Sequence, residues 1–203
     1  MRLFFWMLIT FFVSQTALAQ VFEVKGDTLI YNTDNAVDKS INFGHADILL
    51  DMLQQHKNIR LLKLHSIGGK TIEAKTMANI IIDAGLDTHV NNYCNSSCVR
   101  LFLAGEKRTA SLGVELGFYR AVWDAESIEY YYEFNKDDEG WKTPFDFAAW
   151  LYGDVQKDVY EFITYLTDRG VSADIVAKTY RLGNDEMWYP RRQELLSSGI
   201  LTE

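Results

Sequence analysis

Residues 59–105 read IRLLKLHSIGGKTIEAKTMANIIIDAGLDTHVNNYCNSSCVRLFLAG, and this stretch decides the fold. Its leucine-rich start, 59–65, predicts a strand that is buried on both faces. After Gly68-Gly69, apolar residues return at helical spacing over 71–84, and Gly85 then favours a left-handed helix end. A strand, a glycine turn and a helix in this order indicate a parallel β/α unit with a right-handed crossover.

Elements of the same two kinds are predicted throughout the rest of the chain. We expect strands at 21–24, 28–31, 88–91 and 114–121, and helices at 46–55, 96–104, 172–179 and 191–197. A long apolar stripe at helical spacing predicts a further helix that faces the core rather than a partner: Phe147, Leu151, Val155, Val159, Phe162, Ile163 and Leu166. The fold class is therefore α/β, in one domain without a linker.

The first 19 residues have the pattern of a cleaved signal peptide. Arg2 precedes an apolar run over 3–13, and Ala17-Leu18-Ala19 supplies small residues before Gln20. A retained anchor is disfavoured because the run is shorter than the roughly 20 residues that span a bilayer. We expect a mature domain at 20–203, in the periplasm or secreted, with no membrane span.

The charge of the chain excludes two classes of partner. The formal net charge is −8 over 203 residues, and no Lys/Arg cluster is present. Nucleic acid and anionic lipid are therefore poor candidate partners.

The two cysteines, Cys94 and Cys98, lie four residues apart. In an exported protein this spacing favours a disulfide, because one helical turn brings the two Cα atoms within bridging distance. A zinc site would need two further ligands, and the scattered histidines offer no such pattern. We therefore predict a disulfide, no metal and no cofactor.

Two short segments contain groups that are able to take part in catalysis. The first is 65–69, where a strand stops at paired glycines that expose backbone N–H groups; its plainer explanation is a tight turn. The second is 94–98, which places Ser96 and Ser97 at the start of a predicted helix; there a serine serves either as a nucleophile or simply as a helix cap.

Together, in this order and spacing, these segments resemble the Clp peptidase/crotonase superfamily, and especially exported ClpP-like proteins in which a serine lies between two cysteines. The similarity runs over 59–119 and returns at 194–202. It implies a ClpP/crotonase-like superhelix of ββα units. It also implies Ser96 as the nucleophile, the N–H groups of Gly69 and Ser97 as the oxyanion hole, and Gly68 as the turn of the site.

The sequence departs from the family pattern at the catalytic base. The resemblance places a histidine at the end of the strand after the Ala-Gly turn, and here Tyr119 stands in its place. A phenol with an ordinary pKa is a weak base at neutral pH. Three alternatives remain open: Tyr119 activated by Arg120, Lys70, or His65. Asp185 lies near the position where the family has its acidic catalytic residue; alternatively, it is a solvated loop residue.

Residues 123–141 combine six aromatic with seven acidic side chains. This excursion is either a lid or docking surface next to the site, or a β-hairpin that packs its aromatic residues on the domain. Two functions stay open for the whole chain. One is an exported ClpP-like serine peptidase or acyl hydrolase with weak or lost catalysis. The other is a non-catalytic module that binds a peptide or protein. Both functions are compatible with a homo-oligomer.

Overall fold

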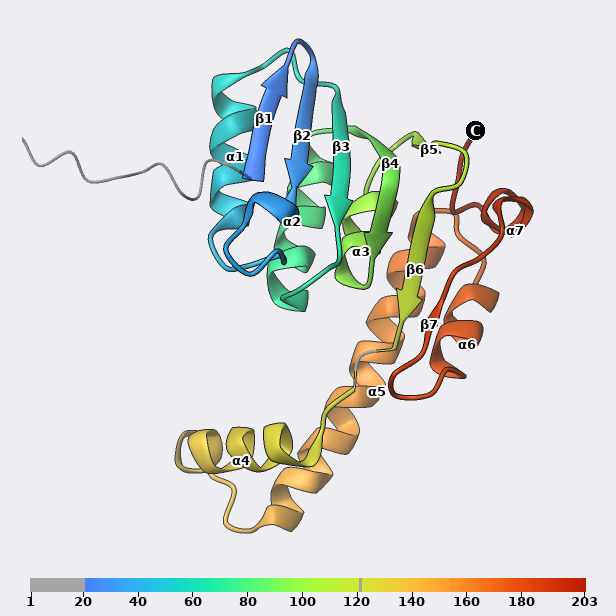
Figure 1. Ribbon diagram of the computed structural model, residues 1–203. Helices are drawn as coiled ribbons and strands as arrows, with labels where there is room; N and C mark the ends of the chain where they lie inside the picture. The colour runs from blue at the N-terminus through green and yellow to red at the C-terminus, as the bar shows by residue number, and fades with distance from the viewer. Residues whose placement is uncertain (1–20, 121) are drawn as a thin grey trace, which may run out of the picture.

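The computed structural model describes residues 21–120 and 122–203, so the predicted signal peptide at 1–19 lies outside the described residues. A seven-stranded sheet forms its centre, in the order β1-β2-β3-β4-β6-β7, with β5 paired to β4 (Figure 1). The strands are β1 (Phe22–Lys25), β2 (Thr28–Asn32), β3 (Leu61–Ser66), β4 (Asp87–Asn95), β5 (Arg108–Ala110), β6 (Glu115–Tyr119) and β7 (Met187–Trp188). This confirms the α/β class.

The strand directions follow from the connections. β1 and β2 form the predicted antiparallel hairpin, turning at Gly26 with φ 64°. β2, β3, β4 and β6 are mutually parallel, as the helical crossovers require, and β7 closes the other edge antiparallel to β6. β4 extends four residues beyond its predicted end at 91, to Asn95, and thereby reaches the serine turn.

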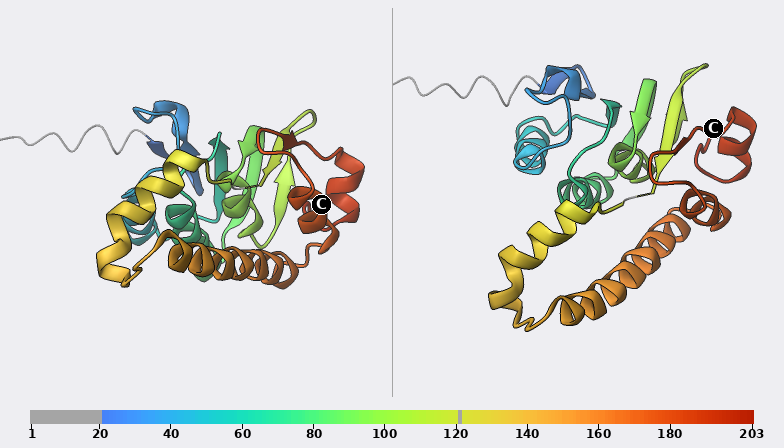
Figure 2. Two further views of the ribbon diagram at one scale, coloured as in Figure 1. Left: turned by 90° about the horizontal axis from the view of Figure 1, so that it is seen from below. Right: turned by 60° about the horizontal axis from the view of Figure 1, so that its bottom comes forward.

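Three helices cover one face of the sheet: α1 (His45–Gln55), α2 (Thr71–Asp83) and α3 (Ser97–Leu103) (Figures 1 and 2). Along β3 only alternate side chains are buried, namely Leu62, Leu64 and Ser66. The prediction that 59–65 is buried on both faces is therefore wrong. Helices cover only the face that carries Leu62 and Leu64, so the other face stays half-buried.

Residues 123–141 do not form a β-hairpin. They form α4 (Ala125–Glu139), which joins α5 (Pro144–Asp168) in a helical arm that projects from the domain (Figures 1 and 2). Asp124 caps α4, and Thr143 with Asp146 forms a capping box at the start of α5. Tyr131 packs on Trp150 within the arm, with ring centroids 5.9 Å apart. The aromatic residues thus pack on the second helix instead of on the sheet.

The apolar stripe of α5 is only partly a core face. Leu166 is buried in the core and Phe147 is buried within the arm, whereas Val155 is 47% and Ile163 is 37% exposed. The prediction of a core-facing helix is therefore wrong for the middle of α5, because the helix is longer than the domain that it packs against. No helix within 21–120 and 122–203 combines the length and apolar character that crossing a membrane requires.

The C-terminal segment, α6 (Asp174–Tyr180), β7 and α7 (Arg192–Ser197), packs beside β6. Arg108 fastens it to the domain. The guanidinium of Arg108 donates to the carbonyls of Gly105, Arg169, Gly199 and Ile200. This places the 184–188 loop and strand next to the end of β6, at the site described below.

Candidate active site

Ser96 lies on a sharp turn between β4 and α3. Its φ is 53° and its ψ is −127°, a conformation that L-residues rarely adopt. Ser96 N–H donates to the Gly117 carbonyl at 2.8 Å, which fixes the turn against β6. A serine on a strained strand-to-helix turn is the arrangement that presents a nucleophilic hydroxyl in many hydrolases.

The helix-cap explanation of Ser96 fails, because its side chain makes no capping hydrogen bond with α3. The neighbouring Ser97 hydroxyl instead donates to the Gly69 carbonyl at 3.0 Å. Ser96 is therefore the serine whose hydroxyl is not used to hold the turn.

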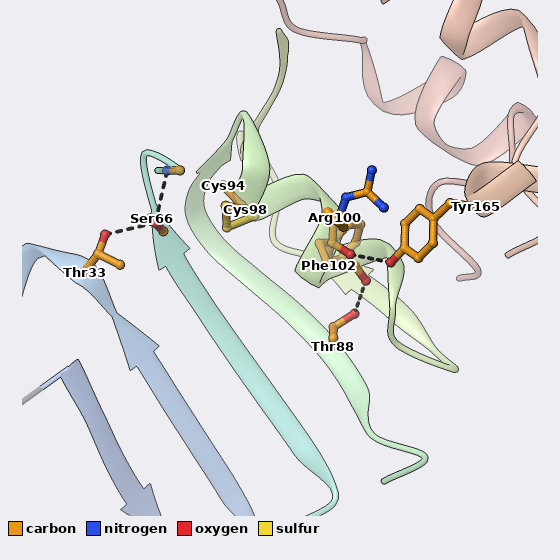
Figure 3. Close-up of a disulfide and its surroundings, with 9 residues drawn as sticks. Thr33, Ser66, Thr88, Cys94, Cys98, Arg100, Phe102 and Tyr165 are labelled. Atoms are coloured by element: carbon orange, nitrogen blue, oxygen red, sulfur yellow. Dashed lines mark hydrogen bonds between the residues drawn. A yellow bond between two sulfur atoms is a disulfide. The ribbon is translucent and has the colours of Figure 1, made fainter. Parts of the chain in front are cut away.

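The predicted disulfide is confirmed. Cys94 and Cys98 are bonded, with their Cα atoms 5.3 Å apart (Figure 3). The bond does not lie within one helical turn, as the spacing argument assumed: Cys94 is in β4 and Cys98 is in α3. The disulfide therefore spans the Ser96 turn and ties the strand to the helix.

The paired glycines are required by close packing against the serine turn. Gly68 has φ 103°, and a Cβ on it would lie 2.7 Å from the Asn95 carbonyl oxygen and 2.8 Å from the Ser96 Cβ. Gly69 has φ 146°, and a Cβ on it would lie 2.4 Å from the carbonyl oxygen of Ile41. Only glycine fits at either position, so the backbone of this turn reaches the serine directly.

Two backbone N–H groups beside Ser96 are available to a ligand. Ile41 N–H donates to the Gly68 carbonyl at 2.7 Å and Lys70 N–H donates to the Ile41 carbonyl at 2.9 Å, so the Gly69 N–H takes no part in this bridge. Ser97 is the first residue of α3, and its N–H has no partner within the helix. Gly69, Ser96 and Ser97 all line one pocket of about 300 Å³.

Tyr119 lines the same pocket, but its hydroxyl faces the C-terminal loop. The Tyr119 hydroxyl donates to the Asn184 carbonyl at 2.9 Å, and the Arg120 Nη2 donates to the Asn184 side-chain oxygen. A phenol that donates this hydrogen bond still carries its own proton, and it would have to lose that proton before it could act as a base toward serine. Asp185, next in the loop, is exposed and does not line the pocket.

The two other base candidates lie outside the pocket lining. His65 Nε2 is 2.9 Å from Asp34 Oδ2, and its ring packs on Tyr93 with centroids 4.0 Å apart. His65 and Ser66 alternate along β3, so His65 faces away from the helix-covered side. Lys70 is not a lining residue either.

The lysine in the pocket is Lys75, which sequence reasoning missed. It lies 3.1 Å from Asp158 and 3.0 Å from Glu161, both on α5. Burial lowers the pKa of Lys75, but the hydrogen bonds and charges of Glu161 and Asp158 raise it to a greater extent. Lys75 is therefore protonated at neutral pH and is a poor general base. Among the described residues, no group of His, Cys, Asp or Glu is placed to hold a metal ion.

Comparison with known proteins supports the fold. No protein-family model gives a significant match to the chain, and no curated protein does. Among solved structures, the fold is similar to that of a ClpP1 point mutant from Listeria monocytogenes, with a TM-score of 0.55 over 87% of this chain and 89% of that chain. The ClpP-like fold is thus confirmed. The identity is 14%, so the likeness shows the fold alone, and the chemistry must be argued from the residues.

Proposed function

We propose that this protein is an exported ClpP-like serine hydrolase of low turnover, which holds a peptide carbonyl at Ser96. The backbone conformation of Ser96, with φ 53° and ψ −127°, carries the proposal. A strained backbone conformation costs conformational free energy, and such strain is concentrated at functional sites. Here the strained serine has a free hydroxyl, lines a pocket and lies beside two available N–H groups.

The geometry supports acyl transfer in one respect and opposes it in another. Attack by Ser96 on a carbonyl would place negative charge on the carbonyl oxygen, where the Gly69 and Ser97 N–H groups would stabilise it; one such donor is worth about 10²–10³ in rate. Removal of the serine proton lacks an evident base, and a positioned base typically contributes about 10²–10⁴. We therefore expect slow acylation instead of efficient turnover.

A second candidate function is a peptide-binding module without turnover. The observation that favours it is the Tyr119–Asn184 hydrogen bond, which occupies the hydroxyl at the family's histidine position. The pocket and the Gly69 and Ser97 donors would then bind a peptide carbonyl without reaction.

A fluorophosphonate probe distinguishes the two functions. We expect slow labelling of the oxidised protein that disappears in Ser96→Ala and persists in Ser111→Ala, a control serine outside the pocket. Tyr119→His tests the missing base directly and should accelerate labelling by about tenfold or more. Absence of labelling in both the wild type and Tyr119→His, with the fold intact, contradicts the hydrolase and leaves the binding module.

We also propose that the arm of α4 and α5 is a self-association surface. Clp proteolytic subunits assemble into rings, and this arm presents exposed apolar side chains, including Val155 and the stacked pair Tyr130 and Phe134, whose centroids are 5.9 Å apart. Sedimentation analysis should show an oligomer that Val155→Asp dissociates. A wild-type monomer at all concentrations tested would contradict this.

Export is proposed on the leader pattern of residues 1–19 and on the disulfide, since disulfides persist mainly in oxidising compartments. Mass spectrometry of protein recovered from the exported fraction should give a chain that begins at Gln20. A chain that retains residues 1–19 would contradict cleavage.

A further inference from the structure

The wall of the pocket beside Ser96 carries three cationic side chains. Arg100 lies in α3, three residues after Ser97 and hence one helical turn along the same face. Arg120 follows the last residue of β6, and Lys75 enters from α2. This concentration is notable in a chain whose formal net charge is −8.

Arg100 has no partner for its charge at hydrogen-bond distance. Its guanidinium lies 4.6 Å from the ring centroid of Tyr165 and 5.7 Å from that of Phe162, and it makes no hydrogen bond or ion pair with any residue that the structure describes. The Tyr165 hydroxyl donates to the backbone carbonyl of Arg100, not to its side chain (Figure 3). Burial lowers the pKa of Arg100. A guanidinium nevertheless stays charged at neutral pH.

Arg120 is also incompletely used. Its Nη2 donates to Asn184, while its Nε is buried and has no hydrogen-bond partner within the described part of the chain. The pKa of Tyr180 is raised, chiefly by burial and further by Asp158, while the charges of Arg100, Lys75 and Arg120 oppose that rise. Tyr180 itself lines the pocket.

The carboxylates near the pocket form ion pairs with Lys75. Asp158 lines the pocket and Glu161 lies next to it, and both contact Lys75. Their charges also act on Arg100, but at a distance that allows no hydrogen bond with it. With Lys75 paired, two guanidinium groups remain with unused donors at the edge of the Ser96 pocket. An unpaired, partly buried cation is best satisfied by an anion.

We propose that the Ser96 pocket selects peptides that carry a carboxylate, bound by Arg100 and Arg120 while a peptide carbonyl lies at Ser96. The inference rests on the proposed function and adds its substrate class. A carboxylate matches the planar fork of a guanidinium and can accept two parallel hydrogen bonds from it. The carboxylate can come from an acidic side chain or from the peptide C-terminus.

Three peptides, each labelled with an uncharged fluorophore, separate these sources. Each has five alanines followed by one residue: glutamate with an amidated end, glutamine with an amidated end, or glutamine with a free C-terminus. Binding is measured by fluorescence anisotropy to the oxidised Ser96→Ala protein, so that turnover plays no part. We expect at least one carboxylate peptide to bind about tenfold or more tightly than the uncharged peptide.

Arg100→Gln and Arg120→Gln, each in the Ser96→Ala background, should abolish this preference. Arg120→Gln provides the test if Arg100→Gln fails to fold by circular dichroism. Lys107→Gln removes an exposed cation outside the pocket and should leave the preference unchanged. Equal binding of all three peptides, or a preference that survives both arginine variants, overturns the inference.

The peptide experiment and the probe experiment fail separately. If no peptide binds but the fluorophosphonate labels Ser96, the substrate class is wrong and the hydrolase stands. If no peptide binds and no labelling occurs, both proposals are overturned.

Discussion

Gly69→Ala provides the sharpest test of how the site is built. A Cβ at this position would lie 2.4 Å from the Ile41 carbonyl oxygen and 2.5 Å from the Ile41 nitrogen. Because ordinary contact begins at 3.4 Å, the Ile41 backbone would have to move by about 1 Å. Ile41 is fully buried, and its two hydrogen bonds, to Gly68 and Lys70, would break.

The expected loss of stability follows from these contacts. Two buried hydrogen bonds at about 1 kcal/mol each, with about 1–2 kcal/mol of backbone strain at φ 146°, give a decrease of about 3–4 kcal/mol in the free energy of unfolding. Gly113→Ala is the matched control. Its φ is 78° and nothing lies within 4 Å of its added Cβ, so it should cost only the strain of about 1–2 kcal/mol.

Urea unfolding followed by circular dichroism measures both variants, with an unchanged slope as the condition for comparison. Equal destabilisation by Gly69→Ala and Gly113→Ala would refute the close packing of this turn. If the clash with Ile41 is relieved by a shift of residue 69 instead of Ile41, its N–H donor moves by about 1 Å and labelling of Ser96 should slow by about 10²-fold.

Three further predictions concern the disulfide, the C-terminal segment and pH. Replacing Cys94 and Cys98 by serine should lower the unfolding free energy by about 2 kcal/mol, which is the loop-entropy value for so short a ring. The same replacement should slow labelling of Ser96, and unchanged labelling would show that the disulfide does not position the turn. Arg108→Met should cost about 3–5 kcal/mol in urea unfolding, because it removes the donor from the carbonyls of Arg169, Gly199 and Ile200; the Gly105 carbonyl still accepts from Arg169. Arg60→Met, at an exposed position, should cost under about 1 kcal/mol, and similar losses would contradict the fastening role of Arg108. Burial lowers the pKa of His45 below its ordinary 6.5, and Tyr31 and Asn42 contact its Nδ1. The unfolding free energy should therefore fall as the pH drops below 6.5, because there only the unfolded chain binds the proton. If the dependence of the unfolding free energy on pH is unchanged in His45→Gln, another group causes it.

The parts of the fold that sequence predicts well are those with strong local signals. Leucine-rich strands, helical periodicity and Gly85 place β3 and α2 within two residues of their observed bounds. Helix α5 was predicted, but α4 was missed because its aromatic residues fit a hairpin or a helix equally well, and only their partners on α5, such as Trp150, decide between the two.

Some residues of the candidate site could likewise be predicted from the sequence, and others could not. Gly68, Gly69 and Ser96 meet because they end neighbouring parallel strands, whose carboxyl ends share one edge of the sheet. Lys75 and Arg100 could not be assigned from sequence, because their roles depend on α5 and α6, which are distant in the chain. Arg100 carries one usable signal, its position one helical turn after Ser97.

The arrangement of Cys94, Ser96 and Cys98 shows how the conformation of the Ser96 turn is held. Nucleophile turns commonly carry glycine two residues before and after the serine, because those two positions approach each other closely. Here the same approach, 5.3 Å between Cα atoms, is bridged by a disulfide. The strained conformation of Ser96 is therefore held covalently and does not depend on a hydrogen bond from a catalytic partner. Under the proposed function, Tyr119 in place of a histidine would remove proton transfer while leaving the Ser96 hydroxyl, the two N–H donors and the pocket in place. Binding should consequently survive where turnover does not, and Tyr119→His should recover rate without a matching change in peptide affinity.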